Sequence, residues 1–199
     1  MKIAMIGATG KVGQVVAAEL LRRGHQVTAI SRGNHTIDGV ETRISDINTD
    51  PDLAAKLGGH DVVISSVRFV EFDQDRLIDT VAKSGVDRYV VVGGAGSLTH
   101  PEGGLIWSNP KFPEAARENS RMGAVYLDKL QDSALNWTFL SPAMLFFDGP
   151  ATGNFRLGRD DALVGPDGKS SVSYGDFAVA LVDELEKPQH ERQRFTVGY

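Results

Sequence analysis

The stretch Lys2-Ile3-Ala4-Met5-Ile6-Gly7-Ala8-Thr9-Gly10-Lys11-Val12-Gly13 decides the fold of this chain. A short apolar run predicts a buried strand before the first glycine. Apolar residues recur at helical spacing after the glycines, at Val12, Val15, Val16 and Leu20. In such a strand–turn–helix, the glycines allow a tight turn, close backbone approach to a pyrophosphate, and close packing of the helix. The expected cofactor contacts are Gly7, Ala8, Thr9, Gly10, Lys11, Val12 and Gly13; the alternative is a glycine loop that only reverses the chain.

The rest of the chain alternates short apolar runs with helical stretches. Strands are predicted over Lys2–Ile6, Gln26–Ile30, Asp61–Val67, Arg88–Val92 and Asn136–Leu140, with weaker ones over Glu41–Ser45 and Arg194–Val197. Helices are predicted after Gly13, around Leu77–Ala82, over Glu114–Ser133, and from Ser173 to Leu185. This alternation predicts an α/β, Rossmann-type doubly wound parallel sheet of 3-2-1-4-5 order. We expect one domain over residues 1–199, with a core over 1–142 and a substrate-side annex over 143–199.

Composition excludes several classes of function. The chain has no cysteine, so it forms no disulfide, thiolate zinc site or iron–sulfur cluster. With 21 Lys and Arg against 26 Asp and Glu, its net charge is −5, which argues against nucleic acid or an anionic membrane as partner. The five histidines are scattered without ligand spacing, so no metal site is expected. The apolar run before Gly7 is too short for a signal peptide or membrane span, and we expect a cytoplasmic protein.

The end of the second predicted strand indicates which dinucleotide is bound. NAD-binding chains carry an acidic residue about 20 residues after the glycines, for the ribose 2′-hydroxyl. Here the strand ends in Ser31 and Arg32, and the next acidic residue is Asp38. A guanidinium and a hydroxyl suit a 2′-phosphate, which favours NADP(H) over NAD(H). The alternative is that Arg32 is an ordinary solvated arginine.

Three motifs together resemble the atypical short-chain dehydrogenase/reductases. They are the glycine turn, the run Val91-Val92-Gly93-Gly94-Ala95-Gly96-Ser97-Leu98, and the run Asn136-Trp137-Thr138-Phe139-Leu140-Ser141-Pro142-Ala143. The nearest branch is that of the single-domain NAD(P)H-binding proteins called NADH-flavin reductases, related to biliverdin reductase B and NmrA-like proteins. The resemblance implies further cofactor contacts at Asp46, Ile47, Ser65, Ser66, Gly93, Gly94, Ser141, Pro142 and Ala143, all near the carboxyl ends of predicted strands. Alternatively, the serines cap the backbone, and Asp46 is a loop carboxylate.

The catalytic residues are less well defined. The superfamily uses a Tyr-x-x-x-Lys pair, whereas this chain has Tyr126 and Lys129, one residue closer. These two, with Ser97, are the catalytic candidates; alternatively, Tyr126 is a packed helix aromatic and Ser97 a polar loop residue. Without a clear proton donor, the best-matched reaction is hydride transfer to an acceptor that takes its proton from solvent, such as a flavin or quinone.

We therefore expect an NADPH-dependent reductase of a small aromatic acceptor. Residues 98–113, rich in glycine and proline, are a candidate lid. Its Trp107 and Phe112, with Phe146 and Phe147, are candidates for the walls of an acceptor pocket; alternatively the last two pack the annex. Two other functions stay open. One is a non-catalytic NADP(H) sensor of the NmrA-like type, and the other is an NAD(P)-dependent epimerase or dehydratase.

Overall fold

One eight-stranded sheet forms the centre of the molecule, in the order β3-β2-β1-β4-β5-β6-β10-β8. The computed structural model describes residues 1–34 and 37–199, so His35, one of the histidines considered for metal binding, lies outside the described residues. The strands are β1 (Lys2–Ile6), β2 (Gln26–Ser31), β3 (Glu41–Ile44), β4 (Val62–Ser65), β5 (Arg88–Val92), β6 (Trp137–Pro142), β8 (Arg156–Gly158) and β10 (Gln193–Gly198). All neighbours pair in parallel except β8 and β10. The predicted Rossmann-type sheet is confirmed.

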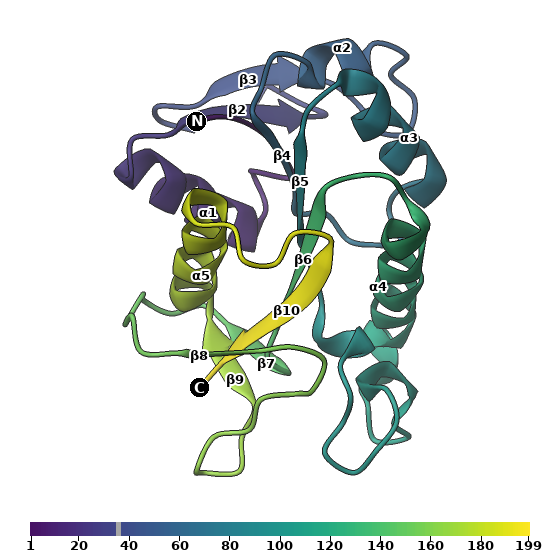
Figure 1. Ribbon diagram of the computed structural model, residues 1–199, viewed down its shortest axis with the longest axis vertical. Helices are drawn as coiled ribbons and strands as arrows, with labels where there is room; N and C mark the ends of the chain where they lie inside the picture. The colour runs from purple at the N-terminus through teal and green to yellow at the C-terminus, as the bar shows by residue number, and fades with distance from the viewer. Residues whose placement is uncertain (35–36) are drawn as a thin grey trace.

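Helices cover both faces of this sheet (Figure 1). On one face lie α1 (Lys11–Arg22) and α5 (Tyr174–Glu186), and on the other α2 (Leu53–Leu57), α3 (Gln74–Ser84) and α4 (Glu114–Asp132). An apolar core lies on each face of the sheet. Successive side chains of a strand point to opposite faces, and helices bury both faces. Two short 3₁₀ helices, η1 (Ala95–Ser97) and η2 (Ile106–Ser108), lie between β5 and α4.

Agreement with the predicted elements is best for strands of the central sheet. The ranges predicted for β1 and β5 match residue for residue, and β10 is confirmed with one more residue at each end. The strand predicted to run to Val67 stops at Ser65, because its neighbour β1 ends at Ile6; the last bond between the two strands runs from the Ser66 N–H to the Ile6 oxygen, at 2.9 Å. The prediction missed α2, β8 and a small parallel sheet of β7 (Leu145–Phe147) and β9 (Ser171–Ser173).

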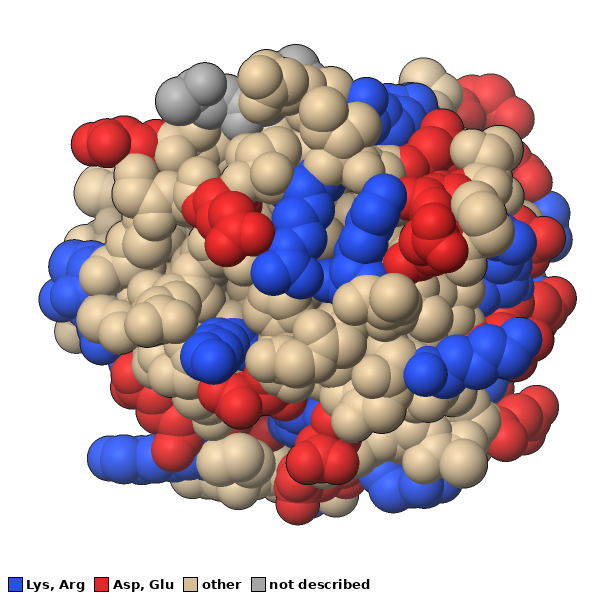
Figure 2. Space-filling view, turned by 90° about the horizontal axis from the view of Figure 1, so that it is seen from above, with Lys and Arg blue, Asp and Glu red and all other residues tan. Residues whose placement is uncertain are grey.

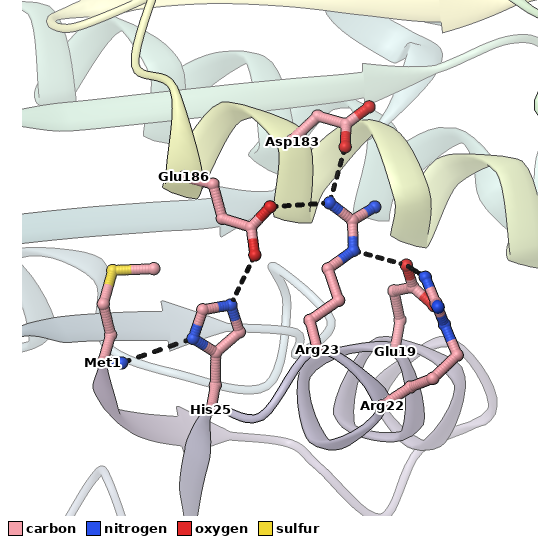
Figure 3. A network of polar contacts seen from close by, with 7 residues as sticks. All are labelled: Met1, Glu19, Arg22, Arg23, His25, Asp183 and Glu186. Carbon is pink, nitrogen blue, oxygen red and sulfur yellow. Dashed lines mark hydrogen bonds and ion pairs between the residues drawn. The ribbon is translucent and has the colours of Figure 1, made fainter.

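A polar network joins the ends of α1 and α5 (Figure 3). Arg23 donates to Glu19, Asp183 and Glu186 at 2.7, 2.7 and 2.8 Å, and His25 pairs with Glu186 at 3.0 Å. Burial disfavours the Arg23 charge, but the hydrogen bonds to these carboxylates outweigh it and raise its pKa. A hollow of about 400 Å³ opens beside the network. Because α1 begins at the glycine-rich turn and ends here, this hollow and the glycine-rich turn lie at opposite ends of α1.

The surface mixes charges of both signs. On the face seen in Figure 2, basic and acidic side chains lie next to one another without forming a continuous basic stripe among the coloured residues. Within the described ranges, no helix is long and apolar enough to cross a bilayer.

Candidate functional site

The turn between β1 and α1 has the backbone geometry of a phosphate-binding turn. Gly7 has φ +82°, and a Cβ atom there would lie 2.1 Å from the Ser66 carbonyl oxygen. A Cβ atom on Gly13 would lie 2.1 Å from the Gly7 oxygen, so α1 packs directly against the turn. At Gly10, a Cβ atom would meet only the Gly7 oxygen, at 3.4 Å. The fold therefore requires glycine at positions 7 and 13, whereas the bare backbone at Gly10 leaves room for a ligand.

The first turn of α1 is open to an anion. Its N-cap is Gly10, which supplies no side-chain acceptor, so the first N–H groups of the helix remain available. Together with the positive end of the helix dipole, these groups favour a phosphate. Lys11 is exposed at the first helical position, while Ala8 is buried and Val12 packs against the core below the turn.

A crevice of about 140 Å³ opens beside this turn, at the carboxyl ends of β1, β2 and β3. The strand order shows that the sheet extends from β1 first to one side and then, through β4, to the other, which is where open α/β sheets bind ligands. The crevice brings together six predicted cofactor residues, Gly7, Thr9, Ser31, Arg32, Asp46 and Ile47. Residues that the sequence analysis missed also line it, among them Ser45, Asn48, Val67 and Glu71.

Arg32 stands at the mouth of the crevice with its guanidinium unused. It is exposed, and within residues 1–34 and 37–199 no hydrogen bond or ion pair holds its side chain. Ser31, half-buried next to it, accepts only a long 3.4 Å hydrogen bond from the Gly33 N–H. The last residue of β2 and the residue after it therefore offer a weakly bonded hydroxyl and a free guanidinium, at the place where open α/β sheets of this order bind the ribose of a dinucleotide.

The turn after β3 is held by a small polar cluster. Asp46 accepts from the Asn48 N–H at 2.8 Å, so one of its oxygens serves the turn itself. Hydrogen bonds from Lys56 and Ser45 lower the pKa of Asp50 to about 2, so Asp50 stays ionised and anchors the turn below the crevice. Asn48 follows Asp46 and Ile47 in this turn, and its position after a strand was the signal that could have identified it.

Ser65 and Tyr126 belong to one buried hydrogen-bonded chain. The hydroxyl groups of Ser65 and Tyr89 lie 2.8 Å apart, and those of Tyr89 and Tyr126 lie 2.7 Å apart. Burial raises the pKa of Tyr89 to about 12 and that of Tyr126 well above its usual range. Lys129 pairs instead with Asp75 at 2.5 Å, on the outside of α4. The structure therefore does not bring Tyr126 and Lys129 together, and Tyr126 packs as a helix aromatic with no exposed surface.

Of the remaining predicted residues, Ser66 follows β4 beside Gly7, and the others lie at the carboxyl ends of β5 and β6. A Cβ atom on Gly93 would lie 2.3 Å from the Phe139 ring, so glycine is needed for packing there, while Gly94 leads into η1. Pro142 is the last residue of β6, and the Ala143 N–H donates to the Val197 oxygen of β10. Ser141 is fully buried, and its hydroxyl has no hydrogen-bond partner in the described part of the chain. Buried hydroxyl groups in folded proteins usually have a hydrogen-bond partner, so this unpaired hydroxyl is unusual.

Ser97 lies in η1, and its hydroxyl oxygen accepts a hydrogen bond. It accepts from Arg194 at 3.2 Å, and the same guanidinium donates to Asp160 at 2.6 and 2.8 Å. The side chain is buried. This hydrogen bond connects η1 to β10.

A second pocket, of about 390 Å³, lies next to this end of the sheet. Its lining is mostly apolar and comes from segment 98–113, the start of α4 and the residue after Ala143, namely His100, Glu102, Ile106, Asn109, Lys111, Phe112, Pro113, Ala116 and Met144. Of the predicted aromatic wall residues, Phe112 lines the pocket, whereas Phe146 packs in the core against Tyr174 and Phe177, with ring centroids 4.6 and 4.8 Å away. Phe147 is partly exposed.

A doubly wound sheet with an open glycine-rich turn at its switch point defines the class of NAD(P)-binding Rossmann proteins. Residues 7–188 match the profile of the NAD(P)H-binding family, and the chain belongs to that family. It is 36% identical to YwnB of Bacillus subtilis, an uncharacterized protein, over 99% of this chain and 98% of that one.

Two solved structures show the same fold over the whole chain. One, from Bacteroides thetaiotaomicron, is provisionally assigned as an epimerase, with 35% identity, a TM-score of 0.92, and coverage of 100% of this chain and 96% of that one. The other, from Streptococcus pneumoniae, is provisionally assigned as an NADH-flavin reductase, with 34% identity, a TM-score of 0.86, and coverage of 100% and 99%. An oxidoreductase-like NAD(P)H-binding protein is thus the class that fold and family define.

Proposed function

We propose that the protein is an NADPH-dependent reductase that transfers a hydride to a flat aromatic acceptor of the flavin or quinone type. The observation that carries the cofactor preference is the uncommitted guanidinium of Arg32 beside Ser31 at the mouth of the crevice. A planar cation with free donors suits a 2′-phosphate and offers nothing specific to a 2′-hydroxyl.

Different residues along the carboxyl ends of the strands would bind different parts of the dinucleotide. The crevice at β1–β3 would hold the adenosine half, with Arg32 and Ser31 on the 2′-phosphate and Ile47 against the base. Gly10 and the first N–H groups of α1 would bind the pyrophosphate. Gly94 and Ser141, at the ends of β5 and β6, would border the nicotinamide half.

When bound, the reduced nicotinamide supplies the hydride. The acceptor gains two electrons with that hydride and takes one proton from water, so no side chain need donate a proton. This suits a site in which Tyr126 is fully buried and hydrogen-bonded to Tyr89, and in which Ser97 is buried beside Arg194. The neighbouring 390 Å³ pocket has an apolar lining that suits the body of an aromatic acceptor.

The experiment that tests the proposed reaction follows NADPH oxidation by the loss of nicotinamide absorbance with FMN, menadione and a small aldehyde. We expect turnover with the first two and little with the aldehyde, which requires a proton donor. Tyr126→Phe is the matched variant, and it should keep its turnover because the hydroxyl has no access to an acceptor. Loss of activity in that variant would instead support a proton relay through Tyr126.

The non-catalytic sensor would be supported by tight NADPH binding with no turnover of any acceptor. An epimerase or dehydratase needs an acid–base pair at the nicotinamide, and the separation of Tyr126 from Lys129 disfavours it.

A further inference from the structure

One arginine of α4 organises the segment that walls the 390 Å³ pocket. Arg117 donates through Nη1 to the carbonyl oxygens of Trp107 and Asn109, at 2.7 and 3.1 Å, and through Nη2 to that of Phe112, at 2.8 Å. Its Nε donates to Glu114 at 2.8 Å. Four contacts thus occupy a guanidinium whose side chain is only 25% exposed.

These contacts hold a segment that has little regular structure of its own. After the single turn of η2, the backbone hydrogen bonds of residues 109–112 are short-range, such as the one from the Phe112 N–H to the Asn109 oxygen, at 2.9 Å. A guanidinium presents its donors in a fixed plane, so one side chain fixes three carbonyl groups over six residues relative to α4. The centre of the guanidinium also lies 6.0 Å from the centroid of the Phe112 ring.

The same segment supplies one side of the pocket. Asn109, Lys111 and Phe112 line it directly, together with Ile106 and Met144. The position of this wall relative to the end of β6 therefore depends on the hydrogen bonds that Arg117 makes. Arg117 itself is not among the lining residues.

We propose that Arg117 is a positioning residue, which fixes residues 107–112 as the wall against which a flat, largely apolar acceptor binds. This inference rests on the proposed function for the identity of the ligand, but not for the ordering of the wall. Without the guanidinium, the three carbonyl groups turn to water and the Phe112 side of the pocket loses its fixed place. The acceptor then binds more weakly, while the distant crevice at β1–β3 is unchanged.

The helix contains a matched control one turn further on. Arg121 pairs with Glu118 at 2.7 Å, with the same spacing of three residues as Arg117 and Glu114, and is 42% exposed. Its remaining hydrogen bond goes to Met122 in the same helix. Arg121→Gln therefore removes a charge and an equivalent surface ion pair without touching segment 107–112.

The test compares the wild type with Arg117→Gln, Arg117→Lys and Arg121→Gln. Hydrogen exchange should be about tenfold faster or more at the amides of Ser108, Asn109 and Phe112 in Arg117→Gln, and unchanged in Arg121→Gln. The KM for menadione should rise about fivefold or more, with the Kd for NADPH changed by less than about twofold. Arg117→Lys, which can serve only some of the carbonyl groups, should lie between, and it stands in for Arg117→Gln if that variant does not fold.

Two results overturn the inference. Unchanged exchange in the Arg117 variants would show that the segment orders itself. Faster exchange with an unchanged KM would show that this wall does not bind the acceptor. If the wild type reduces no acceptor, the proposed function fails, and the exchange measurement still decides whether Arg117 orders the wall.

Discussion

Replacing Gly10 by alanine separates cofactor binding from folding at the glycine-rich turn. The new Cβ atom would lie 3.4 Å from the Gly7 oxygen, an ordinary contact, and the backbone there has φ −72° and ψ 164°, which any residue adopts. The free energy of unfolding should therefore change by less than about 1 kcal/mol. The added methyl group would occupy the space in which a pyrophosphate approaches the backbone of Gly10. The Kd for NADPH should therefore rise about tenfold or more, which corresponds to a loss of about 1.4 kcal/mol of binding free energy.

Gly13→Ala is the contrasting variant. Its Cβ atom would lie 2.1 Å from the Gly7 oxygen and 3.0 Å from the Ala8 Cα, so turn and helix must separate by about 1.3 Å to bring the closer contact to an ordinary 3.4 Å. Such overpacking costs about 1–3 kcal/mol, and the better helix propensity of alanine offsets only part of it. The assay is urea unfolding followed by circular dichroism, paired with calorimetric titration of NADPH. Gly10→Ala with wild-type affinity would refute the pyrophosphate position, and a fully stable Gly13→Ala would refute the packing argument.

Two further predictions concern buried polar groups. Because burial raises the pKa of Tyr89 to about 12, its stabilising contribution should be complete below about pH 10 and lost as the pH rises through about 12. Tyr89→Phe should lower the unfolding free energy by about 1–3 kcal/mol at neutral pH and flatten this alkaline slope, and a slope as steep as that of the wild type would contradict the assignment. For Asp176, burial raises the pKa, but the hydrogen bonds from Tyr199, Thr152 and Gly153 prevail and lower it, so its contribution should be lost as the pH falls below about 4. Asp176→Asn should cost about 2 kcal/mol or more at pH 7 in urea unfolding, and an unchanged midpoint would show that these bonds contribute little.

The sequence predicted those parts of the fold in which local pattern and burial agree. β1 and β5 each consist of a basic residue and four mainly apolar ones, directly before Gly7 and Gly93, so their limits can be read from the sequence. β8 has three residues and no periodicity, and it exists through antiparallel pairing with β10, about 40 residues away. Such a strand depends on long-range pairing that local sequence does not encode.

The candidate site divides in the same way. The glycine-rich turn and Arg32 follow from fixed spacing after strands, and the crevice brings them together. Tyr126 and Lys129 are three residues apart on one helix, but they lie on either side of the boundary between core and solvent, which spacing alone could not resolve. The contacts of Arg117 could not be predicted, because its partners are backbone carbonyl groups of an irregular segment.

The most direct measurement is the Kd for NADPH and for NADH, by titration calorimetry, in the wild type and in Arg32→Ala, with the solvent-exposed Arg22→Ala as control. The wild type should bind NADPH about tenfold more tightly than NADH or better, and Arg32→Ala should weaken NADPH binding about tenfold to a hundredfold while changing NADH binding less than about twofold. The control should behave as the wild type. Equal affinities in the wild type, or an Arg32→Ala variant that keeps its affinity for NADPH, would contradict a site built for the 2′-phosphate.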